Sequence, residues 1–461
     1  MIANDKDDNN STLRILLSFF SKYTNKKILV VMLIVIALLV SDIAFGKIYD
    51  LVNKQSVYAS GVALFIAIAS TFVIGQYFIL GFVKQKSEGI ISKEKTLNTM
   101  QRAVTTVQYV LSAILILMIF QVASASNYNV AMLIVTITIS YTLATAMMGL
   151  LSYRFFSWFK LNKNFVVMLY GIASAAIAVT AGLTFIFMDF TLLNQPQDIG
   201  PQIQGLVPAY GTSSVTGMLN YAFFISSMVS FMITWGTTSQ LLRHYSQKLG
   251  RTKYWIIASI PLVFFLTQFI SYFLKLLSPL ISINPIFFII LFTLIFSLSL
   301  PIGGIMFGIA FWTMARRLHD SNIVRDYMII SACGLVLFFV SSQTNVIQIQ
   351  YTPFGLATTS FEGLASYLVF IGLYSASTSV SQDIKLRQTI RKSANEESKL
   401  LDSIATAQME QEIERRVLRV AIEQSEKMKE ETGIETSLSQ EDAKEYLEEV
   451  LNEIKTFKHR I

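Results

Sequence analysis

The sequence predicts an all-α membrane protein, a polytopic bundle of about ten transmembrane helices with a helical tail in the cytosol. Of its 461 residues, 53% are hydrophobic and only 15% are charged, which is too apolar for an ordinary soluble domain. Apolar runs of about 20 residues, the length that crosses a bilayer, recur as far as residue 380. The composition then changes, because residues 1–395 hold 27 Lys and Arg against 13 Asp and Glu, whereas 396–461 hold 10 against 17.

Residues 1–27 are polar and charged and form a cytosolic segment before the first span. Within it, residues 11–22 place leucines and a phenylalanine at helical spacing behind a candidate N-cap at Ser11. This pattern predicts a short helix on the inner membrane surface, with a solvated disordered lead as the alternative. The apolar run that follows has no Ala-x-Ala cleavage site, so we expect it to be retained as a span.

Ten apolar runs are long enough to cross the membrane. They are residues 28–46, 57–83, 103–125, 128–153, 164–189, 216–241, 254–276, 285–314, 325–342 and 355–380. The segments expected inside the cell hold 20 Lys and Arg, whereas the alternate loops hold only Lys47, Lys54 and Lys275. Since basic residues collect on the cytoplasmic side, both termini are predicted to be cytoplasmic and the protein to lie in the cytoplasmic membrane.

Four ionisable residues fall within or at the ends of the predicted spans. They are Asp42, Asp189, Lys275 and Glu362, and all are expected in the external half of the membrane. Because charge inside a bilayer is costly, such residues are candidates for function. We expect them to meet around an outward-facing polar pocket, with Lys275 neutralising Asp42 or Glu362. The alternative is that each lies near enough to the interface to reach water.

The eighth run contains the residues that most often bend a helix or bring helices together. Pro301 near its centre predicts a kink, and Gly303, Gly304 and Gly308 present little side-chain volume. Glycines four residues apart let two helix backbones approach closely. We expect helix packing here, with an ion or substrate site as the alternative.

The segment from residue 373 to residue 432 contains neither glycine nor proline. A single helix would carry the last span about 90 Å into the cytosol, with a candidate hinge in the Ser-rich residues 375–381. Past this hinge lies a basic collar made of Lys385, Arg387, Arg391 and Lys392. The collar suits contact with anionic headgroups, or it sets orientation only.

Gly433 is expected to end that helix, and residues 433–461 are predicted to form a terminal amphipathic helix. Its apolar stripe needs a partner, and the preceding helix offers one. Because the spacing departs from strict heptads, an antiparallel hairpin or a loose self-associating bundle is favoured over a long coiled coil.

Several classes of function lack their usual signature. The chain has no Gly-rich phosphate loop, no His-Glu-x-x-His and no Gly-x-Ser-x-Gly, so we expect no enzyme and no cofactor. Three scattered histidines and the single Cys333 predict neither a metal site nor an internal disulfide. Positive charge is spread over short loops next to apolar runs, which argues against nucleic-acid binding.

The sequence Tyr351-Thr-Pro-Phe-Gly-Leu-Ala, with Gly363-Leu-Ala-Ser-Tyr-Leu-Val and Glu397-Ser-Lys-Leu-Leu-Asp-Ser-Ile, resembles uncharacterised multi-pass membrane proteins of archaea. The resemblance covers about the last quarter of the chain. It implies a membrane location and carries over no activity and no site residue.

The leading hypothesis is a receptor-like or scaffolding protein. It would sense an event at the outer face and relay that event through the helical tail to a cytosolic partner. The alternative is a secondary transporter or permease whose tail serves in assembly, favoured by the kinked eighth helix. A third option is a membrane anchor that self-associates through the tail. In all three cases the lipid bilayer is a partner.

Overall fold

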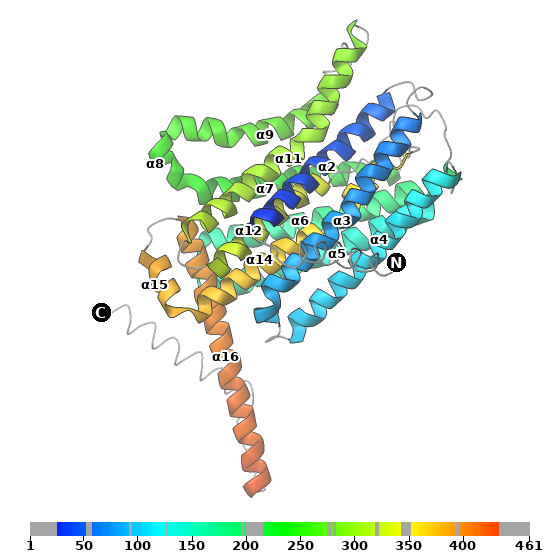
Figure 1. Ribbon diagram of the computed structural model, residues 1–461. Helices are drawn as coiled ribbons and strands as arrows, with labels where there is room; N and C mark the ends of the chain where they lie inside the picture. Colours follow the sequence, from blue (N-terminus) through cyan, green and yellow to red (C-terminus); the bar gives the residue numbers. More distant parts are fainter. Residues whose placement is uncertain are drawn as a thin grey trace, which may run out of the picture.

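The computed structural model describes residues 25–51, 58–91, 95–125, 127–194, 198–199, 215–273, 279, 283–318, 322–342, 352–392 and 396–432. Nearly all of them are helical (Figure 1). The long helices of the bundle are α2 (Asn25–Leu51), α3 (Tyr58–Ile91), α4 (Lys95–Ala125), α5 (Val130–Leu161), α6 (Phe165–Leu193), α7 (Val215–Leu241), α9 (Arg251–Phe273), α11 (Pro285–Arg317), α12 (Asn322–Ser341) and α14 (Glu362–Gln382). A helix therefore lies over each of the ten predicted apolar runs.

Within the described residues, eight helices are long and apolar enough to cross a membrane, and Val30–Phe45 is a shorter apolar helix. The outer helices of the bundle expose large apolar side chains, among them Ile116 of α4, Ile225 of α7 and Val263 of α9. An apolar surface of this extent is typical of a protein that faces lipid. The chain is a helical membrane-type bundle, as the sequence predicts.

The connections contain small elements that the sequence did not predict. β1 (Tyr128–Asn129) pairs antiparallel with β2 (Asp198–Ile199) and ties the α4–α5 turn to the segment after α6. Between α7 and α9 the chain forms η2 (Leu242–His244) and α8 (Tyr245–Leu249). Before α14, the short helix α13 (Leu356–Ser360) begins at Gly355, whose positive φ of 90° favours glycine.

α14 lies at the centre of the bundle, and the apolar part of the span Leu356–Gln382 is entirely buried inside the protein. It packs mainly against α12 and α5. The contact with α12 is close because glycines stand on both sides of it. A Cβ added at Gly372 would lie 2.7 Å from the Tyr327 carbonyl oxygen, and one added at Gly334 would lie 2.8 Å from the Val369 nitrogen.

The glycines of α11 occupy the same kind of contact. Cβ atoms added at Gly304 and Gly308 would lie 3.3 Å and 2.9 Å from backbone carbonyl oxygens of α12, and Gly303 faces the ring of Phe231. Pro301 lies inside α11. The three glycines therefore bring α11 close to its neighbours, which is a packing role.

The prediction of one unbroken helix from residue 373 to residue 432 is wrong. α14 ends at Gln382, Asp383 is extended (φ −103°, ψ 103°), and α15 (Ile384–Lys392) and α16 (Glu396–Thr432) follow as separate helices. The physical reason is a cap, because the Asp383 carboxylate accepts a hydrogen bond from the Leu386 backbone N–H at 3.0 Å. Leu386 and Ile390 of α15 are then buried, which stabilises the bend.

The four basic residues of the predicted collar lie in α15. Arg387 is half-buried, and its guanidinium contacts the Met409 sulfur of α16. The side chains of Lys385, Arg391 and Lys392 lie outside the described residues, as do the predicted surface helix at 11–22 and the terminal helix at 433–461.

α16 crosses the end of α14 and projects beyond the bundle (Figure 1). Its first third is buried against the ends of α5, α6 and α14, and from Ile413 onward most of its large apolar side chains are exposed. The buried apolar residues of this part are Leu400, Leu401, Ile404, Ala405 and Ala407. The start of the tail is thus part of the bundle, and only its later part stands free in the described structure.

Candidate functional site: a cavity beside Glu362

A cavity lies inside the bundle between α5, α6, α7, α11, α12 and α14. The space open to the centre of a water molecule is about 30 Å³, which is room for about two waters. Phenylalanines form its apolar wall. Its hydroxyl groups come from Tyr141, Thr180, Thr184, Ser227, Ser230 and Ser342. The one carboxyl group on the lining is that of Glu362.

The break between α13 and α14 positions Glu362. Phe361 joins the two helices, so Glu362 begins α14 in the interior, where its side chain is 1% exposed. The Ser341 hydroxyl lies 2.5 Å from Glu362 Oε2, and the Ser342 hydroxyl lies 2.7 Å from Oε1. Both serines stand at the end of α12, which holds the carboxyl group in place from both sides.

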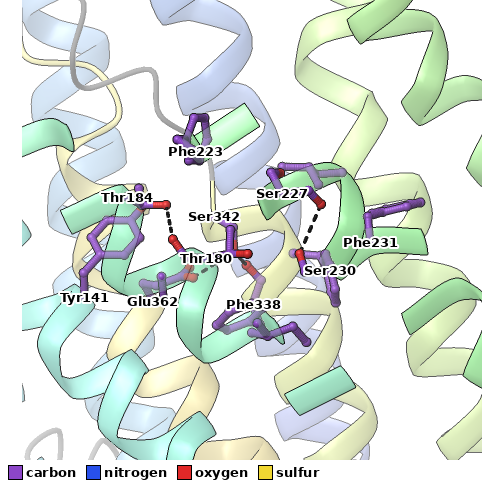
Figure 2. Close-up of a pocket in the computed structure, with 14 residues that line it drawn as sticks. Tyr141, Thr180, Thr184, Phe223, Ser227, Ser230, Phe231, Phe338, Ser342 and Glu362 are labelled. Carbon is purple, nitrogen blue, oxygen red and sulfur yellow. Dashed lines mark hydrogen bonds between the residues drawn. The ribbon is translucent and has the colours of Figure 1, made fainter. Parts of the chain in front are cut away.

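Tyr141 of α5 lines the same cavity, and Figure 2 shows its ring beside Glu362. The tyrosine is buried, and its hydroxyl has no hydrogen-bond partner among the residues that the structure describes. A buried hydroxyl without a partner costs free energy unless a water or ligand satisfies it. The site therefore has an unused donor and acceptor directed at the space next to the carboxyl group.

Two other predicted pocket residues, Asp42 and Asp189, lie apart from this cavity. Asp42 of α2 is buried, and its Oδ2 accepts hydrogen bonds from the Thr358 hydroxyl at 2.6 Å and the Thr358 backbone N–H at 3.3 Å. Asp42 and Glu362 thus sit near the two ends of α13, each with its own hydroxyl partners. Asp189 of α6 accepts a hydrogen bond from the Thr138 hydroxyl at 2.9 Å and is not on the lining. Lys275 lies outside the described residues.

A second cavity continues the first toward the α16 end of the bundle. Ile177 of α6 lines both cavities, so this side chain stands between them. The second cavity offers about 20 Å³ to the centre of a water molecule and is mostly apolar, with hydroxyls from Ser174, Thr234 and Thr238 among its lining.

Aromatic side chains connect the far end of the second cavity to α16. Phe155 lines it and packs edge-on against Trp158, with ring centroids 5.5 Å apart. The Trp158 indole N–H donates to Gln408 Oε1 of α16 at 3.0 Å, and Gln408 Nε2 donates to the Tyr374 hydroxyl at 3.5 Å. This connection has no signal in the sequence, because it depends on α16 folding onto the bundle.

Further hydrogen bonds fix α16 to the ends of α5 and α6. The Asn164 amide donates to the Ser403 hydroxyl at 2.7 Å, and the Gln411 amide donates to the Ser157 hydroxyl at 2.5 Å. Asn164 also caps α6 by accepting from the Val166 N–H at 2.9 Å. One side chain therefore both begins a bundle helix and anchors the tail.

Among the described residues, no three His, Cys, Asp or Glu side chains group as metal ligands. No family model matches the chain, and no curated protein or solved structure matches it. The resemblance to archaeal membrane proteins accordingly stays a prediction.

Proposed function

We propose that this protein is a secondary transporter or permease whose cavity beside Glu362 binds the transported or coupled species. The observation that supports this proposal is the buried carboxyl group of Glu362 facing a hydroxyl-lined cavity within membrane-type helices. A carboxyl group in such a place is costly and is typical of substrate and ion pathways. The second cavity, which shares Ile177, extends the same line toward α16.

The sizes of the cavities favour a closed intermediate of a transport cycle over an open channel. Together they hold only a few waters, so any solute must open the bundle to enter. Two places can bend, namely Pro301 within α11 and the break at Phe361 between α13 and α14. Discontinuous helices beside a central site are a recurring feature of transporters.

The proposed orientation follows from charge. The ends of α3, α5 and α11 near α16 carry basic residues, namely Lys84, Lys86, Arg154, Lys160, Arg316 and Arg317, and the positive-inside rule places this end in the cytoplasm. Both termini are then cytoplasmic, Glu362 lies in the external half of the membrane, and α16 projects into the cytosol.

Thiol labelling tests transport without knowledge of the solute. Cys333 is the single cysteine and is buried, so a Cys333→Ala background is free of thiols. Thr184→Cys places a thiol in the first cavity, and Thr238→Cys places one in the second. We expect a membrane-impermeant methanethiosulfonate to modify Thr184→Cys from the side opposite α16 and Thr238→Cys from the α16 side, because each cavity opens in turn.

The matched control is Ser366→Cys in α14, which is equally buried and lines neither cavity. It should stay unmodified from both sides. Protection of both cavity cysteines from both sides, in protein that elutes as a single species, would count against alternating access and against a transporter.

A receptor-like or scaffolding role is the second candidate, and one observation favours it. α14 carries Glu362 at one end and, on its last turns, Tyr374, which meets Gln408 of α16. A change at the cavity therefore has a direct mechanical connection to the tail, through packed side chains and not through a continuous rod. Glu362→Gln should then alter trypsin cleavage of α16 in liposomes, whereas a purely structural anchor predicts no change.

The projecting half of α16 is the proposed contact surface for a cytosolic partner or a second copy of the chain. Ile413, Val417 and Val420 are about 40–60% exposed there. Truncation after Arg416 keeps the contacts of Ser403, Gln408 and Gln411 with the bundle. If the truncated protein keeps the thiol labelling of its cavities but loses cross-linking between copies, the tail serves in assembly and the bundle in transport.

A further inference from the structure

Among the residues that the structure describes, no positively charged side chain lies beside the enclosed carboxyl group of Glu362. No Lys, Arg or His is among the residues that line its cavity or bond to its oxygens. An ionised carboxylate in such surroundings is strongly disfavoured unless a cation or a proton joins it. A ligand that binds this carboxyl group must therefore bring positive charge.

The hydroxyl groups around Glu362 suit two protonation states. Ser341 Oγ lies 2.5 Å from the Glu362 carboxyl group and 3.1 Å from the Phe338 carbonyl oxygen. Ser342 Oγ lies 2.7 Å from both the carboxyl group and the same carbonyl. A hydroxyl has only one hydrogen, so each serine can donate to only one of these two acceptors at a time.

In the ionised state both serines donate to the carboxylate. In the neutral state the carboxyl O–H donates to one serine oxygen, and that serine turns its own hydrogen to the Phe338 carbonyl. The carbonyl does not depend on the serines, because the Ser342 backbone N–H also donates to it at 2.9 Å. The rotation of one hydroxyl therefore satisfies every group in both states.

Three of the remaining hydroxyls of the cavity already take part in hydrogen bonds, and Glu362 is the one carboxyl group among the described lining residues. Thr184 and Ser230 donate to carbonyl oxygens of their own helices at 2.7 Å and 3.1 Å, and Thr180 bonds to Ala176 and Ser226. A hard metal ion needs about six oxygens around one point. A proton needs only the carboxyl oxygen and a water to deliver it, and the cavity has room for about two waters.

We propose that Glu362 is a proton-binding site, at which a hydronium ion in the cavity transfers its proton to the carboxylate. An O–H bond forms on Glu362, one O–H bond of hydronium breaks, and neutral water is left in the cavity; release is the reverse. The unpartnered Tyr141 hydroxyl lies on the same cavity and can hold this water. The inference rests on the proposed transporter role and makes the proton its coupled species.

The titratable groups near Glu362 are few. Tyr141 of α5 is the other titratable side chain on the lining, and Asp42 of α2 meets Thr358 on the preceding turn of the chain. The residues that α6, α7, α11 and α12 contribute to the lining carry no charge. A protonation signal from the bundle thus has several carboxyl sources to separate, namely Glu362, Asp42, Asp189 and Asp326.

Infrared difference spectroscopy of the purified full-length protein, titrated with pH, separates them. We expect a carbonyl stretch of a protonated carboxyl group that disappears at high pH in the wild type, is lost in Glu362→Gln, and persists in the matched control Asp42→Asn. In Ser342→Ala the band should move to higher frequency, because one hydrogen bond to the carboxyl group is gone; this variant carries the test if Glu362→Gln does not fold.

Three results would overturn the proposal. The first is a titrating carbonyl band that is unchanged in Glu362→Gln, and the second is a band whose frequency is the same in Ser342→Ala as in the wild type. The third is a Glu362 carboxylate that stays ionised at every pH and responds to added Na⁺, which would make a metal cation the ligand. Thiol labelling separates this failure from failure of the transporter role. Labelling from opposite sides without a titrating band leaves transport in place and removes the proton.

Discussion

The contact between α12 and α14 allows a sharp test of the packing, because Gly372 leaves no room for a side chain. Its added Cβ would lie 2.7 Å from the Tyr327 carbonyl oxygen and 2.8 Å from the Ser331 nitrogen, both backbone atoms of α12. An ordinary van der Waals contact begins near 3.4 Å, so Gly372→Ala must push the helices apart by about 0.7 Å. Overpacking of this kind costs about 1–3 kcal/mol.

Gly149 of α5 is the matched control, since nothing lies within 4 Å of a Cβ added there. Gly149→Ala should therefore gain about 0.5–1 kcal/mol from the lower backbone entropy of alanine. We expect a lower melting temperature for Gly372→Ala and an equal or higher one for Gly149→Ala when thermal unfolding in detergent is monitored by circular dichroism.

The size of the shift can be set in advance. One kcal/mol corresponds to about 2–4 °C in domains of 150–250 residues, and to less in a longer chain. A fall of roughly 2 °C or more is expected for Gly372→Ala. If Gly372→Ala has the same melting temperature as the wild type, or if both variants lower it equally, the inferred close approach of α12 and α14 is wrong.

Two further predictions concern polar contacts at the α16 end. Lys86 Nζ lies 2.7 Å from Asp326 Oδ2, and the Asp326 side chain is only 5% exposed. The Lys86→Met variant should be about 1–3 kcal/mol less stable than the wild type, because it leaves the buried carboxylate unpaired. The double variant with Asp326→Asn should recover most of this stability, and a double variant that unfolds at the same temperature as Lys86→Met would contradict the pairing. Gln408→Leu leaves the buried Trp158 N–H without an acceptor, so α16 should be cleaved by trypsin several times faster than in the wild type, and an unchanged rate would show that this bond does not hold the tail.

The positions of the long helices could be predicted from the sequence because a bilayer demands about 20 apolar residues for each crossing. The helix breaks could not. The absence of Gly and Pro permits a continuous helix from 373 to 432 but does not require one, and Asp383 ends α14 by capping α15. That cap is favourable only because Leu386 and Ile390 find a buried surface, which depends on the tertiary fold.

Sequence reasoning predicted the central residue of the candidate site, Glu362, but not the side chains that surround it. A carboxyl group within a span marks Glu362 from the sequence alone. The partners of Glu362 depend on which helices become neighbours in the fold. Nothing in the sequence links Ser341, Ser342 or Tyr141 to Glu362. Asp42 was expected to share a pocket with Glu362, but the hydroxyl and backbone N–H of Thr358 hold it separately.

The complete enclosure of α14 has a consequence for how the bilayer acts on this protein. The apolar parts of α4 and α7 are only 28% and 22% buried, so these helices meet the acyl chains directly, while α14 meets none. A thinner or thicker bilayer would first tilt the outer helices, at a modest cost for each ångström of mismatch. A change in lipid composition would therefore affect α14 only indirectly, through the helices that surround it.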